Sequence, residues 1–176
     1  MLMITICQAA WADVEINEKN FPDKNFRKWV LGQSYGKDGI LTDEEIAEIT
    51  EINVSNKDIH DLKGIEYFAA LESLNLDRNI LKSVDVSKNR NLAYLRVGWN
   101  QLTSLDVSKN KALRFLMCGG NSLTDLNVSG CTALEWIRCW RNRFNGAAMD
   151  SLVKNLPSVK KAYLHAIDSL YERNAM

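Results

Sequence analysis

Four copies of a 21-residue motif constrain this sequence more than any other feature. Each copy reads L-x-x-[LI]-x-[LVC]-x-x-N, and the copies begin at Leu71, Leu92, Leu113 and Leu134. The apolar residues that follow the motif keep the same spacing, at Leu81, Leu102, Leu123 and Phe144. A weaker copy begins at Ile49, 22 residues before the first. A fixed period of this length indicates a repeat architecture, because a single unit cannot bury its apolar side alone.

The spacing inside the motif predicts a strand. The second and third apolar positions are two residues apart, so they share one face of an extended segment. Stacking then produces a solenoid with parallel strands, which we expect near Leu74, Leu95, Leu116 and Ile137. An asparagine ends each motif, and its amide can donate to and accept from backbone groups at the turn. We therefore expect a ladder formed by Asn79, Asn100, Asn121 and Asn142.

These motif residues are those of leucine-rich repeats. The 21-residue form, in which Cys118 and Cys139 replace the third apolar residue, resembles the cysteine-type repeats of bacterial internalin-like surface proteins. The resemblance covers residues 49–144 and implies a leucine-rich-repeat solenoid. Such a solenoid has a curved parallel β-sheet, with short coil or turn segments on the other side. It implies no particular ligand, because one fold serves many functions.

Three cysteines fall within the repeats. We expect Cys118 and Cys139 to lie side by side in the core as thiols, because parallel side chains in register suit a disulfide poorly. Cys131 takes the place of an asparagine in the repeated Asp-Val-Ser-Lys-Asn segment, so its turn should lose part of the hydrogen bonding.

The ends of the chain differ from the repeats. Residues 1–12 end in Ala-Trp-Ala after an apolar run, which resembles the end of a secretory signal peptide; a short buried strand or helix is the alternative. Residues 13–48 are typical of a helical N-terminal cap, with one helix over 23–31 and a second from the capping box at Thr42 through Ile49.

Residues 145–176 are expected to form a C-terminal cap. A short helix is predicted over 146–155, with Ala148, Leu152 and Val153 on one side. One more strand is predicted over 163–167. The sequence leaves open whether this cap is complete, since related bacterial repeat proteins often continue past such a segment.

A degenerate calcium loop lies between the two N-terminal helices. The segment from Ser34 to Glu45 resembles an EF-hand loop, with Gly39 at its sixth place. Calcium needs carboxylates at places 1, 3, 5 and 12, but Ser34 and Gly36 hold the first two of these places. We therefore predict no metal and no cofactor.

The sequence also excludes several function classes. It contains no glycine-rich phosphate loop, no G-x-S-x-G and no H-E-x-x-H, and His60 and His165 are about a hundred positions apart. We therefore predict no catalytic residues and no enzyme. Lys plus Arg equals Asp plus Glu at 22 each, which argues against a nucleic-acid partner. The sequence contains no run of about 18 apolar residues, so we predict no transmembrane segment.

The variable positions of the motif carry the functional prediction. They alternate with core residues and therefore face outward on the sheet, where aromatic residues, Met and Arg favour protein binding. The predicted partner-binding residues are Tyr94, Arg96, Trp99, Phe115, Met117, Trp136, Arg138, Trp140 and Arg141. The alternative is that these aromatic rings only stack on one another and stiffen the sheet.

We assign this aromatic half of the repeat to the concave sheet. The sequence then predicts a secreted or cell-surface module, monomeric, that binds a protein through its concave aromatic and Arg-rich sheet. A glycan that stacks on the same aromatic column is the alternative partner. The neighbouring Arg and Met residues favour protein.

Overall fold

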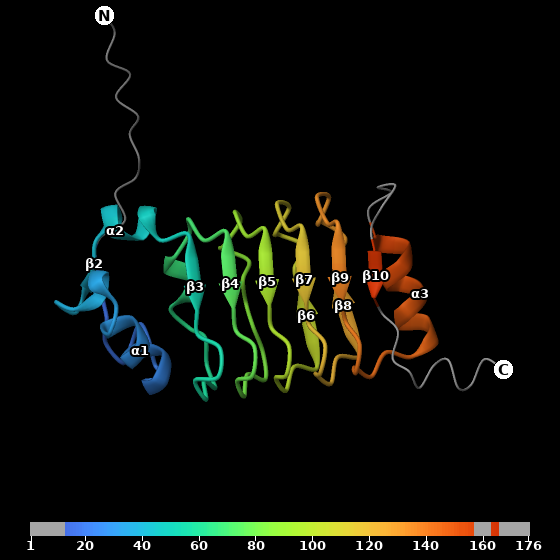
Figure 1. Cartoon of the computed structure of the whole chain (residues 1–176), viewed down its shortest axis with the longest axis horizontal. Helices are drawn as coiled ribbons and strands as arrows, with labels where there is room; N and C mark the ends of the chain where they lie inside the picture. The colour runs from blue at the N-terminus through green and yellow to red at the C-terminus, as the bar shows by residue number, and fades with distance from the viewer. Residues whose placement is uncertain (1–12, 157–162, 166–176) are drawn as a thin grey trace, which may run out of the picture.

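The computed structural model describes residues 13–156 and 163–165, most of which form a parallel β-solenoid (Figure 1). Six short strands lie side by side in one parallel sheet, in the order β10-β9-β7-β5-β4-β3. Their bounds are Glu51–Asn53 (β3), Ser73–Asn75 (β4), Tyr94–Arg96 (β5), Phe115–Met117 (β7), Trp136–Arg138 (β9) and Tyr163–His165 (β10). The predicted solenoid and its four central strands are confirmed.

The 21-residue period sets the register of this sheet. Leu74 pairs with Leu95, Leu95 with Leu116, and Leu116 with Ile137, so equal positions of successive repeats stand next to each other. The weak first copy joins the array, since Ile52 of β3 pairs with Leu74. β10 adds a further coil after β9. Columns of equivalent side chains therefore follow directly from the sequence period.

The uniform half of two repeats forms a second, smaller sheet. β6 (Ser104–Asp106) and β8 (Asp125–Asn127) pair in parallel, with Leu105 opposite Leu126. In the first coil the 3-10 helix η2 (Ile65–Tyr67) lies in the corresponding stretch. The aromatic half of the repeat belongs to the six-stranded sheet, and its assignment to the concave side stays a prediction.

One continuous apolar core runs between the two sheets. In the repeat that begins at Leu92, six side chains are each at most 2% exposed: Leu92, Leu95, Val97, Leu102, Leu105 and Val107. Burial of one such side chain contributes about 1.5–3 kcal/mol. Each coil buries this set only because the next coil covers it, which explains why the repeats must stack.

The predicted asparagine ladder is confirmed. The side-chain amide of Asn121 donates to the carbonyl of Val97 in the preceding coil (2.9 Å) and to that of Cys118 in its own coil (3.0 Å). Its Oδ1 accepts from the N–H of Leu102 (3.0 Å). Asn100 and Asn142 repeat this arrangement, so each turn of backbone is held to the one before.

A second ladder follows the uniform half of the repeat. The amide of Asn110 donates to the carbonyls of Val86 (2.9 Å) and Asn89 (2.8 Å). Cys131 occupies the next equivalent position, and its thiol donates to the carbonyl of Val107 (3.1 Å). Within the described part of the chain this is the single ladder bond of Cys131, where Asn110 makes two. The predicted partial loss at Cys131 is confirmed. The Oδ1 atoms of Asn89 and Asn110 are buried with no hydrogen-bond partner among the described residues.

Replacing Asn110 tests this second ladder. Asn110→Ala should lower the free energy of unfolding by about 2–4 kcal/mol, because the carbonyls of Val86 and Asn89 lose their donor. Asn110→Cys should cost about half as much, since a thiol keeps one bond, as Cys131 does, and removes the unpartnered oxygen. Urea unfolding of the two variants measures both values. Equal losses would contradict this account of the ladder.

The cysteines of the repeats are buried free thiols. Burial raises the pKa of Cys131 to about 12 and the pKa of Cys139 to about 11. Burial, assisted by the neighbouring Cys139, also raises the pKa of Cys118 well above its usual range. All three therefore stay protonated at neutral pH and behave as small apolar side chains, as predicted.

The signal-peptide prediction falls on residues 1–12, outside the described residues.

A helical segment precedes the first coil (Figure 1). Its elements are β1 (Val14–Glu15), α1 (Lys24–Leu31), the 3-10 helix η1 (Ser34–Gly36), β2 (Ile40–Leu41) and α2 (Asp43–Glu48). Oδ1 of Asp23 accepts from the N–H of Phe26 (2.9 Å) at the start of α1, and Oδ2 accepts from the N–H of His60 (2.8 Å) in the first coil. Burial raises the pKa of Asp23, but these backbone bonds outweigh it and lower the pKa overall. One carboxylate thus ties the helical segment to the solenoid.

The predicted capping box opens α2, but the helix is shorter than expected. Thr42 and Glu45 exchange the two capping bonds. The helix ends at Glu48, and Ile49 has an extended backbone (φ −82°, ψ 97°), so the prediction of a helix through Ile49 is wrong. The reason is that Ile49 begins the first coil, where its side chain is buried.

Helix α3 (Gly146–Asn155) begins and ends where the sequence predicts. The side chain of Asn145 caps it by accepting from the N–H of Ala148 (2.8 Å). Leu152 is buried, whereas Val153 is 52% exposed, so the prediction that the two lie on one side of the helix is wrong for Val153. The reason is that successive residues of a helix are rotated by about 100°, so Val153 points away from the side on which Leu152 is buried. Among the described residues, the helices are too short or too polar to cross a membrane.

Candidate binding surface

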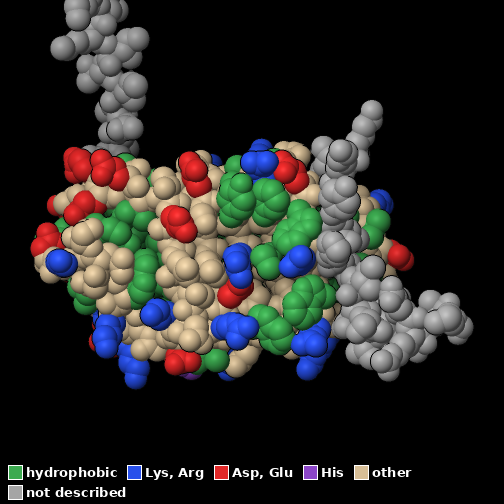
Figure 2. Space-filling model, viewed as in Figure 1, with side chains coloured by type: hydrophobic (Ala, Val, Ile, Leu, Met, Phe, Trp, Pro, Cys, Tyr) green, Lys and Arg blue, Asp and Glu red, His purple; other side chains and the backbone are tan. Residues whose placement is uncertain are grey.

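The outward side chains of the six-stranded sheet gather into one surface, which we call the aromatic face. It consists of Tyr94, Arg96, Trp99, Phe115, Met117, Trp136, Arg138, Trp140 and Arg141, the nine residues singled out from the sequence. Figure 2 shows hydrophobic side chains grouped toward the C-terminal half of the sheet, with Lys or Arg side chains among them. The strands place six of these residues by simple alternation, because each central residue of β5, β7 and β9 is buried and its two neighbours are not. Trp99, Trp140 and Arg141 follow the ends of β5 and β9.

Three aromatic rings form a row across adjacent strands. Tyr94 and Phe115 stand opposite each other in register, and their rings stack with centroids 4.9 Å apart and planes 4° apart. Phe115 also contacts Trp136 on its other side (6.4 Å, 58°). The 21-residue period thus brings together three rings that are far apart in the sequence. We call this set the aromatic row.

A pair of tryptophans forms a second group, beyond the ends of the strands. Trp99 and Trp140 meet edge to face, with centroids 5.5 Å apart. The coil between them carries Gly119 and Gly120, and a Cβ at these positions would approach Trp140 to 3.0 Å and Trp99 to 2.8 Å respectively. The two glycines therefore leave the room that the two indoles fill. Arg141 lies over both rings, at 5.5 Å from Trp99 and 5.2 Å from Trp140.

The eighth position of the motif has the same backbone conformation in every copy. Arg78, Trp99, Gly120 and Arg141 all have positive φ, between 52° and 70°. Only Gly120 adopts this left-handed region without strain, and each of the others costs about 1 kcal/mol or more. The repeat geometry imposes this conformation and directs the side chains of Trp99 and Arg141 onto the face.

The arginines of the face differ in their partners. Arg96 forms an ion pair with Asp77 (2.6 Å), whose other oxygen accepts from the N–H of Gly98 (2.8 Å). Arg138 instead places its guanidinium over the ring of Trp136, at 4.4 Å. Sequence reasoning identified both arginines but missed Asp77, which is 8% exposed and fixes Arg96 in place.

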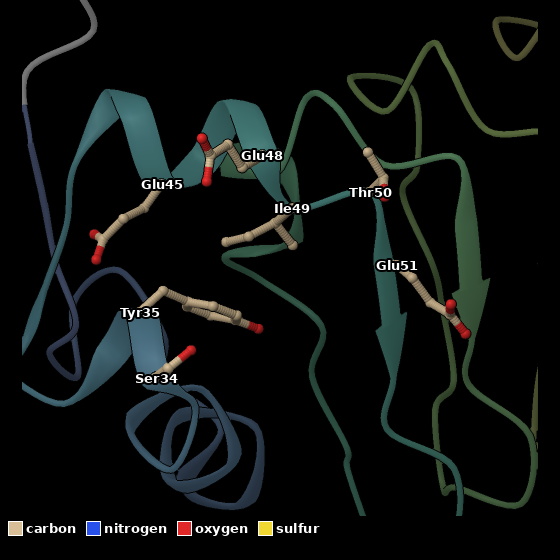
Figure 3. Close-up of a pocket in the computed structure, with 7 residues that line it drawn as sticks. All are labelled: Ser34, Tyr35, Glu45, Glu48, Ile49, Thr50 and Glu51. Atoms are coloured by element: carbon tan, nitrogen blue, oxygen red, sulfur yellow. The ribbon is translucent and has the colours of Figure 1, made fainter.

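A separate hollow of about 620 Å³ lies between the helical segment and the first strand (Figure 3). Its lining includes Tyr35, Glu45, Glu48 and Glu51. Burial raises the pKa of Tyr35 to about 12, so its hydroxyl is neutral. Within residues 13–156, no three His, Cys, Asp or Glu side chains are grouped so as to hold a metal ion. The acidic side chains that line the hollow are therefore not grouped around one point where they could bind a metal ion together.

Calcium should leave the thermal stability unchanged. The two carboxylates at calcium-ligand places of the EF-hand-like loop are engaged locally, since Glu45 accepts from the N–H of Thr42 (2.9 Å) and Asp38 from the N–H of Ile40 (3.0 Å). A ligand of the native state raises the melting temperature by mass action. Thermal melts with saturating Ca²⁺, with Mg²⁺ as the control, check this. A rise with Ca²⁺ and not with Mg²⁺ would overturn the prediction.

No protein-family model matches the sequence, and no curated protein matches it either. Among solved structures, the functional domain of InlJ from Listeria monocytogenes, described as including a cysteine ladder, is similar with a TM-score of 0.67 and 33% identity. That match covers 76% of this chain and 30% of the InlJ chain. The internalin InlF of the same species is similar with a TM-score of 0.58 and 23% identity, and the match covers 82% of this chain and 51% of the InlF chain.

A leucine-rich-repeat protein of Leptospira interrogans is similar with a TM-score of 0.51 and 18% identity, over 68% of this chain and 38% of that protein. The chain thus spans about a third to a half of the length of these proteins. The InlF and Leptospira structures share the fold alone, whereas InlJ is also one-third identical. Together with the 21-residue period, the ladders and the adjacent Cys118 and Cys139, these findings show that the chain is a leucine-rich-repeat protein with cysteine-type repeats similar to those of internalins.

Proposed function

We propose that this chain is an exported protein-binding module whose aromatic face is the contact surface. The observation behind this proposal is the packing of five aromatic rings, two of them highly exposed, on a sheet that has no need of them for its core. Tyr94 and Trp99 are each 44% exposed. Apolar surface of this kind is rare on monomers without a binding role, and Trp, Tyr and Arg dominate binding hot spots.

The contacts within the face favour tight binding. Phe115 is held between Tyr94 and Trp136, and Arg138 rests on Trp136. Side chains that are already fixed before binding lose less conformational entropy when a partner arrives. A protein surface with matching pockets can therefore engage these rings with little reorganisation.

A glycan is the alternative partner, and the ring geometry favours protein over it. A sugar stacks on an open aromatic face. Phe115 has a ring on each side, and one face of Trp136 is covered by the guanidinium of Arg138. Tyr94 and Trp99 keep the largest exposed areas, so they are the rings on which a sugar would have to stack.

The remaining support comes from the similar solved structures and from the signal-peptide-like pattern at the start of the sequence. The similar structures of InlJ and InlF are internalins, and a leucine-rich-repeat solenoid of this kind suits protein interaction better than catalysis. Export rests on the Ala-Trp-Ala pattern at residues 10–12 and on the same likeness. We accordingly propose a secreted or cell-surface location, a monomer and no enzymatic activity.

Photo-crosslinking from two opposite positions tests the proposal. Benzoylphenylalanine replaces the exposed Tyr94 in one variant and the exposed Lys109, on the uniform half, in the other. Irradiation with intact cells or surface extracts should give a protease-sensitive adduct from position 94 that excess unmodified protein abolishes, and none from position 109. Adducts from position 109 alone, or binding to a glycan array that Tyr94→Ala and Trp99→Ala remove, would refute it.

A further inference from the structure

The cations of the aromatic face fall into two classes. Arg96 is neutralised on the chain itself by Asp77 (2.6 Å), and Arg114, which lies beside the face over the ring of Phe115, is neutralised by Glu135 (2.7 Å). Arg138 and Arg141 are exposed, and within the described part of the chain neither forms an ion pair. Both unneutralised guanidiniums belong to the coil of β9, so, among the nine residues of the face, the unpaired positive charge lies at the C-terminal end.

Aromatic rings hold both of these guanidiniums in place. Arg138 lies 4.4 Å from the centre of the Trp136 ring, and Arg141 lies within 5.5 Å of the centres of two indoles. A guanidinium that stacks on a ring keeps its N–H groups free, and their planar fork matches a carboxylate. Two forks of fixed orientation, with no counter-charge among the described residues, therefore stand beside an apolar row.

From this arrangement we infer that the partner presents an acidic polypeptide segment, with carboxylates on Arg138 and Arg141 and apolar side chains against the aromatic row. The inference rests on the proposed function and specifies the chemistry of the partner. Charge complementarity selects carboxylates, and the apolar row beside them selects a segment with apolar residues between its acids. Anionic glycans offer carboxylates as well, but they bring no apolar side chains for the row.

The two arginines should contribute by position and not only by charge. Buried charge pairs at an interface depend on geometry, whereas charges at the rim act mainly on the association rate. Arg→Lys changes keep the charge but lose the bidentate fork, so they separate the two effects.

The test uses a defined acidic probe, the random copolymer poly(Glu,Tyr), with poly(Lys,Tyr) and polysialic acid beside it. The parent should bind poly(Glu,Tyr) and not poly(Lys,Tyr). The Arg138→Gln/Arg141→Gln variant should lose at least about tenfold in affinity, as expected for hot-spot residues. Lys109→Gln, which removes one charge from the opposite sheet, should change affinity less than about twofold. The Arg138→Lys/Arg141→Lys variant keeps the protein testable should the neutral variant fold poorly, and its loss should be intermediate.

Three results would overturn the inference. They are no binding of poly(Glu,Tyr), equal losses in the Lys109 and arginine variants, and stronger binding of polysialic acid than of the polypeptide. Failure here is distinguishable from failure of the proposed function. Equal yields of the protein adduct from position 94 in the parent and in the two arginine variants would separate the two. That result would support the aromatic face as the binding surface and refute an acidic segment in the partner.

Discussion

Leu95→Asp is expected to unfold this protein. Leu95 is 1% exposed and stands in register between Leu74 and Leu116, at the centre of the six-stranded sheet. The substitution removes a large apolar side chain and places a carboxylate in an apolar core without a cation. The cost is on the order of several kcal/mol, comparable with the total stability of a domain.

The solenoid makes this site especially sensitive, because each coil is stabilised mainly by its two neighbours. Circular dichroism should show the loss of strand signal, or a melting temperature lowered by more than about 10 °C. Lys109→Asp, at an exposed position of the same repeat, is the matched control and should stay within about 0.5 kcal/mol of the parent. A Leu95→Asp protein that melts within a few degrees of the parent would disprove the core assignment.

Trp136→Ala should weaken binding of a captured protein partner at least tenfold. The ring lies between Phe115 and Arg138, so its removal takes away contact area and also releases the guanidinium that it supports. Hot-spot aromatics typically contribute about 2 kcal/mol or more to binding.

Folding should survive the same change. The lost ring contact and cation–π contact amount to about 1–2 kcal/mol of unfolding free energy, because the ring lies outside the core. Lys109→Ala should alter neither affinity nor stability. Affinity measurements paired with melting curves for each variant check both statements. A collapse of the fold in Trp136→Ala would mean that the residue belongs to the core, and unchanged affinity would place the ligand elsewhere.

Most of the fold could be predicted because the repeat fixes both local structure and register. The alternation of Leu95 and its neighbours specifies which side chains are buried, and a constant period stacks equivalent residues. Helix ends were harder to predict. Ile49 satisfies a helical pattern, yet its burial in the first coil ends α2 one residue earlier.

The membership of the aromatic face was readable from the sequence, but its internal contacts were not. Arg96 and Arg138 occupy the same position of the motif and look equivalent. The structure shows that the residue 19 positions earlier decides their state, since Arg96 meets Asp77, whereas Gly119 at the matching place offers Arg138 no acid. This offset is a property of the stacked coils and has no meaning until the register is known.

The room for the indoles was hidden for the same reason. Gly119 and Gly120 look like an ordinary flexible turn in the sequence. In the stacked coils they lie against Trp140 and Trp99, where a Cβ would crowd the Trp140 ring at 3.0 Å and collide with the Trp99 ring at 2.8 Å. The signal that could have revealed them is the stacking of the seventh and eighth motif positions, which sets Gly119 next to Trp140 and Gly120 next to Trp99.

Oxidative footprinting of the complex tests the central claim most directly, that the aromatic face is the binding surface. Hydroxyl radicals react strongly with Trp, Tyr, Phe and Met, and the face carries six such residues: Tyr94, Trp99, Phe115, Met117, Trp136 and Trp140. Trp29 and Tyr35, in the helical segment, serve as internal controls that are partly exposed. We predict that partner binding lowers the oxidation of the six residues severalfold and leaves that of Trp29 and Tyr35 unchanged. Protection of the two controls with unchanged oxidation of the six would contradict the account.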